Sequence, residues 1–125
     1  MKTIIETNDA PAPIGPYSQA VLSGNTLYTS GQIALNPKSG ELISASIEAE
    51  TTQVMENMKA VLNEADMDFQ NVVKASIFIS DMDNFNRINE VYNNYFTNKF
   101  PARETVEVAR LPKDVNVEIS MIAVK

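Results

Sequence analysis

The sequence predicts an α+β fold in which two helices cover one face of a mixed β-sheet. Two observations support this class. Short runs with the two-residue period of strands occupy both ends of the chain, whereas two longer segments follow the 3.6-residue period of helices. The expected order of elements is βββαβαββ. A chain of 125 residues has the size of one domain, so we expect residues 1–125 to fold as a single unit.

The first third of the chain contains three predicted strands. Residues 2–7 form a short strand, and residues 8–16 form a loop rich in proline and glycine. Two β-prone runs, 20–23 and 26–30, flank a Gly-Asn pair, which is typical of a hairpin turn. A further turn follows at residues 36–40.

Two segments have the spacing of amphipathic helices. Between residues 46 and 65, apolar side chains recur every three to four positions, and Ser46 is placed to cap the first turn. The second helix is expected to follow Asp81 or Asp83, either of which can cap it, and to continue to about Phe96. This acidic pair lacks the glycine and the terminal glutamate of a calcium loop, so we interpret it as capping.

The remaining strands lie between and after the helices. The strand at 72–79 is expected to direct one alternating set of side chains to the core: Val73, Ala75, Ile77 and Ile79. Residues 105–109 form the next strand, 111–114 a turn and 115–124 the last strand. Both faces of this last strand are mainly apolar, which indicates that both are at least partly covered.

The composition restricts the chemistry that this chain can perform. It contains no cysteine and no histidine, which removes thiolate catalysis, the commonest metal ligand and the commonest proton shuttle at neutral pH. The formal net charge of −6 disfavours nucleic acid as a main partner, because phosphate binding needs a cationic surface. No segment has the length of a membrane span or a signal peptide, so we expect a cytoplasmic protein without a membrane partner.

Two charged residues near the C-terminus are the first candidates for a functional site. Arg103 begins a strand, where its guanidinium could bind a carboxylate or form a structural ion pair at the surface. Alternation directs Arg103 and Thr105 to one face and Glu104 to the other. Glu118 lies within the apolar last strand, where burying a carboxylate is unfavourable unless a partner or a function compensates for it. It is either a general base with a raised pKa or one half of a structural ion pair.

Further positions could line a pocket, although each also has an ordinary structural explanation, such as packing or the end of a strand. Tyr17 lies in a loop that enters a strand, where it can wall a pocket or donate a hydroxyl. Gly31, which follows Ser30, would allow the backbone to approach a ligand closely. Asn89 lies beside the apolar stripe of the second helix.

Four sequence blocks together resemble one known family. The blocks are residues 12–20 (APIGPYSQA), 28–33 (YTSGQI), 81–89 at the start of the second helix, and the region from 101–103 through 118–119. In this order they are similar to the RidA (YjgF) family of reactive-intermediate deaminases, and the similarity extends along essentially the whole chain.

This resemblance implies a fold, an assembly and an activity. The fold would be chorismate-mutase-like, and three copies would form a homotrimeric barrel with clefts between subunits. The activity would be hydrolysis of 2-imino acids, such as 2-iminobutanoate and 2-iminopropanoate, to 2-oxo acids and ammonia, without a metal or cofactor. A non-catalytic small-molecule-binding or regulatory role is the alternative. The acidic charge and the absence of histidine disfavour a third role, RNA cleavage.

The resemblance also implies roles for individual residues. Arg103 would hold the substrate carboxylate, and Glu118 would position or activate a water molecule. The remaining residues would contact the substrate: Tyr17, Ser30, Gly31, Asn89 and Thr105.

Two positions depart from the family pattern. Residue 104, usually small, is Glu104 here, and residue 105, often cysteine, is Thr105. Thr105 excludes thiol chemistry but keeps a backbone N–H that can bind a carboxylate oxygen. Glu104, directed away from Arg103, is expected to tune substrate preference or to meet a neighbouring subunit without blocking anion binding.

Overall fold

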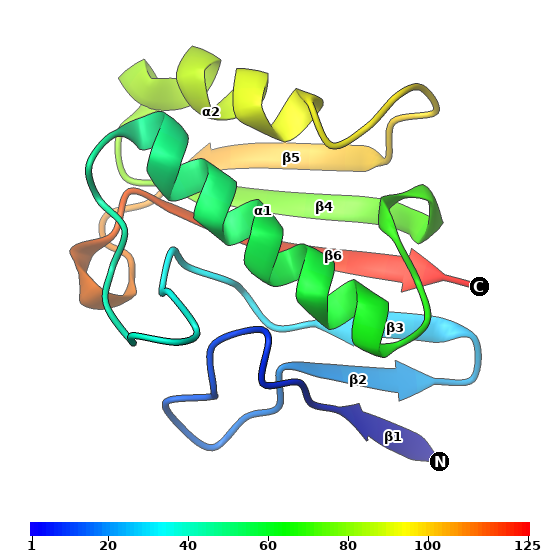
Figure 1. The fold of residues 1–125 in the computed structure, drawn as a ribbon. Helices are drawn as coiled ribbons and strands as arrows, with labels where there is room; N and C mark the ends of the chain where they lie inside the picture. The colour runs from blue at the N-terminus through cyan, green and yellow to red at the C-terminus, as the bar shows by residue number, and fades with distance from the viewer.

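The computed structural model describes residues 1–125 as one six-stranded sheet with two α-helices on one of its faces (Figure 1). The elements follow the order βββαβαββ, as the sequence predicts. The helices are α1 (Ile47–Glu64) and α2 (Phe85–Asn93). The strands are β1 (Lys2–Ile5), β2 (Ala20–Ser23), β3 (Thr26–Thr29), β4 (Val72–Ile79), β5 (Ala102–Glu107) and β6 (Val117–Val124).

The strand order across the sheet is β1-β2-β3-β6-β4-β5, so the last strand of the chain lies inside the sheet. Neighbouring strands are antiparallel, except for β4 and β5, which are parallel. The connection between these two strands contains α2, which lies near β5 at the edge of the sheet (Figure 1). Neither helix combines the length and apolar character that crossing a lipid bilayer requires.

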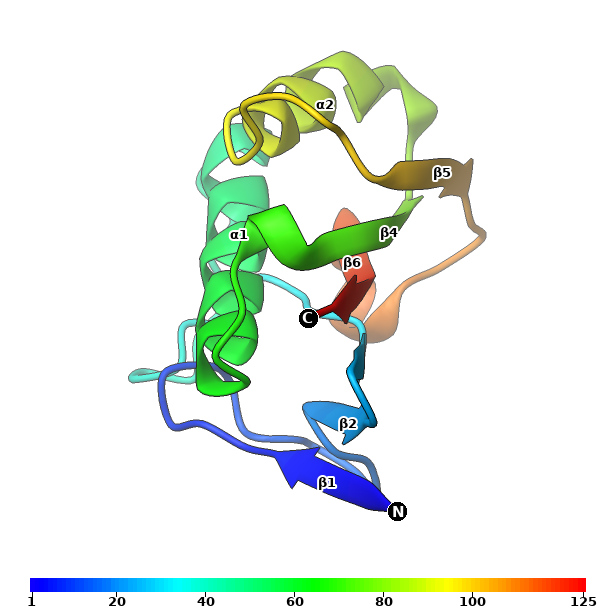
Figure 2. The same cartoon turned by 90° about the vertical axis from the view of Figure 1, so that its right-hand side faces the viewer.

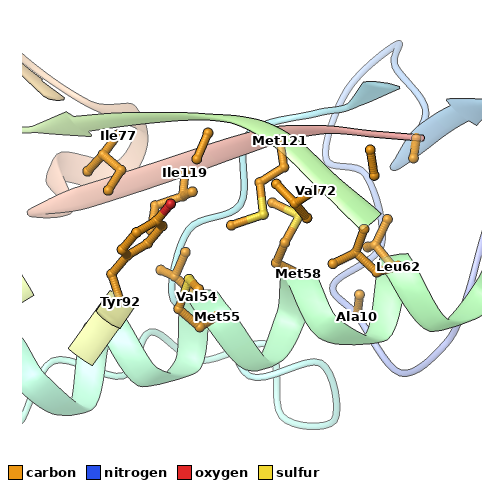
Figure 3. Close-up of a cluster of buried hydrophobic side chains, with 14 of the residues drawn as sticks. Ala10, Val54, Met55, Met58, Leu62, Val72, Ile77, Tyr92, Ile119 and Met121 are labelled. Atoms are coloured by element: carbon orange, nitrogen blue, oxygen red, sulfur yellow. The ribbon is translucent and has the colours of Figure 1, made fainter. Parts of the chain in front are cut away.

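The core lies between the sheet and the helices (Figure 3). Val54, Met58 and Leu62 of α1 are buried at helical spacing, and they belong to one cluster with Ile77 of β4 and Ile119 of β6. Each helix buries one stripe of side chains with a period of 3.6 residues, and each strand buries one face with a period of two residues. Segments with these two periods therefore alternate along the sequence.

The predicted N-cap of α1 is confirmed. The Ser46 hydroxyl accepts a hydrogen bond from the Ala49 N–H at 3.0 Å. The start of α2 differs from the prediction, because Asp81 accepts from the Asp83 N–H at 2.9 Å and caps a 3₁₀ turn that precedes the helix.

The predicted end of α2 at about Phe96 is wrong by three residues. The Tyr95 and Phe96 N–H groups donate to carbonyls three residues earlier, at 3.1 and 3.2 Å. The chain therefore tightens after Asn93 and no longer continues as an α-helix.

Two predictions about the strands are also wrong. Val73 is 49% exposed, because the pairing of β4 with β6 shifts register between Val72 and Lys74 and the bulge gives the core position to Val72. The strand predicted at 105–109 is β5, which begins at Ala102 because its parallel pairing with β4 starts there. β2 and β4 have the predicted bounds, and one end of each of β1, β3 and β6 differs from the prediction by one or two residues.

The face of the sheet opposite the helices carries no layer from the same chain (Figure 2). Apolar side chains on this face are well exposed: Ile4 49%, Tyr28 49%, Val106 40% and Val124 37%. Leu27 and Ala123, which precede Tyr28 and Val124 along their strands, are buried on the helix-covered face. Alternation therefore places Tyr28 and Val124 on the other face. The sheet is therefore apolar on both faces. The helices cover one face, whereas the other is covered only around Phe78, which packs against a small cluster of Ile33, Leu35, Leu111 and Val115.

Candidate functional site

The structure separates the predicted site residues into two groups on opposite faces of the sheet. Glu118 aligns across the strands with Phe78 and, through it, with Val106, on the face without helices. Arg103 aligns instead with Ala75, whose side chain is fully buried beneath the helices. A single chain therefore does not bring Arg103 and Glu118 together.

The first group, the Glu118 cluster, consists of Tyr17, Ser30, Gly31 and Glu118. These residues line a cavity of about 350 Å³, together with part of the 11–19 loop and the segment that follows β3. The Tyr17 hydroxyl accepts from the Ile14 N–H at 3.3 Å. The Ser30 hydroxyl donates to a backbone carbonyl of the same loop at 2.5 Å. Both hydroxyls are thus held in place by the loop that forms one wall.

Gly31 lies directly against the Glu118 side chain. A methyl group added at residue 31 would lie 2.7 Å from the Glu118 Cδ and 2.9 Å from its Oε2. Real side chains do not approach this closely, so only glycine leaves room for the carboxylate where it stands.

Glu118 is half-buried and has no ion-pair partner in the chain. Burial raises its pKa above the ordinary value of 4.5, because removal from water disfavours the charged form. The structural ion pair considered from the sequence is therefore absent. What remains is a carboxylate with raised basicity at the wall of a cavity.

The second group, the Arg103 cluster, consists of Phe85, Asn89, Tyr92 and Arg103. The Arg103 Nη1 donates to the Asn89 Oδ1 at 2.7 Å. Its Cζ lies 5.1 Å from the centroid of the Tyr92 ring and 5.7 Å from that of Phe85. Residues 85, 89 and 92 are four and three positions apart, so one face of α2 presents all three.

Arg103 differs from the other two arginines of the chain. Arg87 pairs with Glu48 at 2.6 Å, and Arg110 pairs with Asp114 at 2.7 Å. Arg103 has no carboxylate within ion-pair distance. The alternative of a structural ion pair is therefore absent here too, and the guanidinium can receive an anion from outside the chain.

Glu104 points away from Arg103, as alternation predicts. On the face without helices it accepts a hydrogen bond from the Ser76 hydroxyl and pairs with Lys74 at 2.9 Å. These contacts lower the pKa of Glu104, the Ser76 hydrogen bond contributing most, so it stays charged at neutral pH.

Two hydroxyls on the helix-covered face are buried without a hydrogen-bond partner. They belong to Tyr92 and to Thr105, which lies two residues after Arg103 and aligns with Ile77. Burial raises the pKa of Tyr92 to about 12, so its hydroxyl is neutral at physiological pH.

Comparison with known proteins identifies the family. Residues 7–125 match the model described as Endoribonuclease L-PSP. The chain belongs to this family, which includes the RidA (YjgF) proteins. The resemblance predicted from the sequence is confirmed.

Individual relatives of this RidA-family chain carry different names. It is 50% identical over 125 residues to a RutC family protein of Pyrococcus horikoshii, covering 100% of the chain and 99% of that relative. It is 45% identical over 125 residues to human 2-iminobutanoate/2-iminopropanoate deaminase, covering 100% and 91% respectively. Escherichia coli TdcF with bound serine matches with a TM-score of 0.95 and 43% identity, covering 98% of each chain. The names of these relatives do not agree on one activity.

Sequence reasoning did not predict that Phe85 and Tyr92 lie against Arg103. Both occupy apolar positions of α2, where packing against the core is the ordinary explanation. Their spacing from Asn89, four residues before and three after, was the available signal. It gains meaning only once Arg103 is known to lie over the same face of the helix.

Proposed function

We propose that this protein hydrolyses 2-imino acids, such as 2-iminobutanoate and 2-iminopropanoate, to 2-oxo acids and ammonia. The observation that carries the proposal is Arg103, the one arginine without a carboxylate partner in its own chain. A 2-imino acid offers the missing carboxylate, which the planar guanidinium can bind through two N–H groups. The name of the human relative, a 2-iminobutanoate/2-iminopropanoate deaminase, supports this substrate class.

In the proposed reaction, Arg103 binds and Glu118 performs the proton transfer. Binding of the carboxylate fixes the adjacent C=N carbon in one position. Glu118 accepts a proton from a water molecule as the water oxygen bonds to that carbon, which gives a tetrahedral carbinolamine. With the imine nitrogen protonated at the outset, the protonated carboxyl then returns its proton to the amino nitrogen of the carbinolamine. As the C–N bond breaks, the Glu118 carboxylate takes up the proton of the carbinolamine hydroxyl and the C=O bond forms, so that ammonia and the 2-oxo acid leave and the proton passes to solvent. The raised pKa of Glu118 suits both transfers.

The other predicted site residues support this reaction. Tyr17 and Ser30 wall the cavity beside Glu118, where the side chain of the imino acid would lie. Gly31 leaves room for the carboxylate. Asn89 orients Arg103 through its 2.7 Å hydrogen bond, and Thr105 offers a backbone N–H close to Arg103 in the sequence.

The reaction requires Arg103 of one copy and Glu118 of another to share a site. The two side chains lie on opposite faces of their own sheet, so association is the direct way to bring such residues together. A cyclic homotrimer would place the Arg103 cluster of each copy beside the Glu118 cluster of the next. It would also cover the exposed apolar face of the sheet, which is otherwise left in water.

The test is an Arg103→Ala variant assayed on 2-iminobutanoate. The imine is generated by threonine dehydratase, and semicarbazide traps what the protein fails to hydrolyse. Loss of a charged bidentate contact is expected to lower kcat/KM about 100-fold. Arg110→Ala, which removes an exposed ion pair, is the matched control and should remain active. Unchanged hydrolysis by Arg103→Ala would refute the proposal.

Binding without turnover is the second candidate. E. coli TdcF, which is 43% identical to this chain, has a solved structure with bound serine, and this favours a site that can hold an amino acid. The two candidates differ in stoichiometry. An enzyme accelerates the release of 2-oxobutanoate over many turnovers, whereas a binding protein protects at most one imine per site.

A further inference from the structure

We infer that Phe85 and Tyr92 are positioning residues that hold the Arg103 guanidinium ready for a carboxylate without neutralising its charge. The inference rests on the proposed function, because it takes Arg103 as the group that binds the substrate anion. It adds two aromatic side chains to the site, and it assigns them the orientation of Arg103.

The geometry is that of a cation held against two aromatic rings. The Arg103 Cζ lies 5.7 Å from the Phe85 centroid and 5.1 Å from the Tyr92 centroid. Both distances fall within the roughly 6 Å over which a guanidinium is attracted to the face of an aromatic ring. Asn89, between them on the same face of α2, fixes one guanidinium nitrogen at 2.7 Å.

Arg87 shows what a carboxylate partner would do instead. Its Nε and Nη2 both donate to Glu48, at 2.7 and 2.6 Å. Such a pair occupies the donors that a substrate carboxylate needs, and it cancels most of the charge. An aromatic face attracts the cation and takes up no N–H group. The donors of Arg103 that do not bond Asn89 therefore stay free.

The Tyr92 ring is itself fixed by the core. Tyr92 is only 3% exposed, and its centroid lies 4.9 Å from that of Phe96. In Figure 3 its side chain projects from α2 toward Ile77 and Ile119 of the sheet. A ring that cannot move limits the positions of the cation beside it, which lowers the entropy cost of binding.

Nuclear magnetic resonance of the arginine side chains can test this arrangement. The chain has three arginines and hence three Nε–H signals, which Arg87→Lys and Arg110→Lys variants assign. Ring currents should displace the Arg103 signal from the other two. Tyr92→Leu is expected to lose most of this displacement and to weaken 2-oxobutanoate binding about fivefold to tenfold. KM should rise by a similar factor with kcat little changed, and Tyr92→Phe, which keeps the ring, should behave like wild type.

Phe69→Leu is the matched control. Phe69 packs edge-on against Tyr95 and Phe96, with centroids at 5.3 and 5.5 Å, and no cation–π contact joins it to Arg103. Its loss should lower the melting temperature while the Arg103 signal and KM stay unchanged.

The outcomes separate this inference from the proposed function. If Arg103→Ala binds 2-oxobutanoate poorly but Tyr92→Leu and Phe85→Leu bind it like wild type, the positioning role is overturned and the proposed function survives. If Arg103→Ala itself binds as tightly as wild type, the proposed function fails. Should Tyr92→Leu not fold, Phe85→Leu carries the same test, because Phe85 is only partly buried.

Discussion

The Arg103 and Glu118 clusters hold their charged groups in opposite ways. Arg103 is exposed beside α2, between two aromatic rings that leave its charge intact. Glu118 is half-buried, and burial raises its pKa toward the neutral form. Neither has an ion-pair partner in the chain. A permanently charged cation suits binding, and a carboxylate that changes protonation readily suits catalysis, so we assign the two tasks to different clusters.

The largest expected effect comes from recombining the two clusters between chains. Arg103→Ala and Glu118→Gln should each be nearly inactive alone. In a cyclic trimer, every mixed assembly pairs one intact Arg103 with one intact Glu118. Equal mixing, by co-expression or joint refolding, should therefore restore about a quarter of wild-type deaminase activity.

The control for this mixing is the double variant Arg103→Ala/Glu118→Gln. Combined with either single variant, it offers no interface with both residues intact, so activity should stay at the background. If the mixture of the two single variants shows no more activity than the sum of the activities that each shows alone, the shared site is refuted.

A methyl group at residue 31 should disrupt one cluster and spare the other. In Gly31→Ala the new Cβ would lie 2.7 Å from the Glu118 Cδ, so the carboxylate must move. We expect kcat to fall roughly 10-fold to 100-fold, with 2-oxobutanoate binding at Arg103 little changed. Gly24→Asn, at a turn with open space around the added atoms and a φ of +59° that asparagine tolerates, controls for loss of a glycine. Full activity in Gly31→Ala would show that the position of Glu118 does not matter.

The sequence predicts the order of the elements because each helix or strand buries one face, and the spacing of apolar residues on that face can be read within the segment itself. It fails where distant pairing decides, as at Val73, where a bulge against β6 gives the inward position to Val72, while Ala75, Ile77 and Ile79 face the core as predicted. The start of β5 was missed because an edge strand tolerates the polar residues 103–105.

The site could be predicted in part for the same reason. Motifs identified Arg103 and Glu118 one by one, but their placement on opposite faces depends on strand order and register. Both residues lie on strands adjacent to β4, and their partners there, Ala75 and Phe78, are an odd number of residues apart. An odd separation along a strand means opposite faces, and no property of either segment alone contains that information.

The raised pKa of Glu118 makes a prediction about pH. Activity that needs its carboxylate should decline on acidification at a pH above 4.5, the ordinary value for glutamate. A raised folded-state pKa stabilises the fold below the unfolded pKa, and this contribution is lost as pH rises through the folded value. Glu118→Gln should therefore melt higher than wild type at pH 7, and the difference should shrink toward pH 4. An equal melting temperature at pH 7 would indicate that burial of this carboxylate has no cost.

The smallest expected effect concerns the Tyr92 hydroxyl, one of the two buried hydroxyls that lack a hydrogen-bond partner. The Tyr92 hydroxyl has no partner, but in our assignment the ring and not the hydroxyl holds Arg103. Tyr92→Phe should therefore raise the free energy of unfolding by about 1 kcal/mol and leave deaminase activity unchanged.

Tyr95→Phe, which loses a 2.7 Å hydrogen bond to Glu56, should lower the free energy of unfolding by a similar or smaller amount, about 0.5–1 kcal/mol. Opposite signs in urea titrations of the two variants would show that the unpaired hydroxyl is a local cost. A loss of activity in Tyr92→Phe would instead show that the proposed reaction uses this hydroxyl.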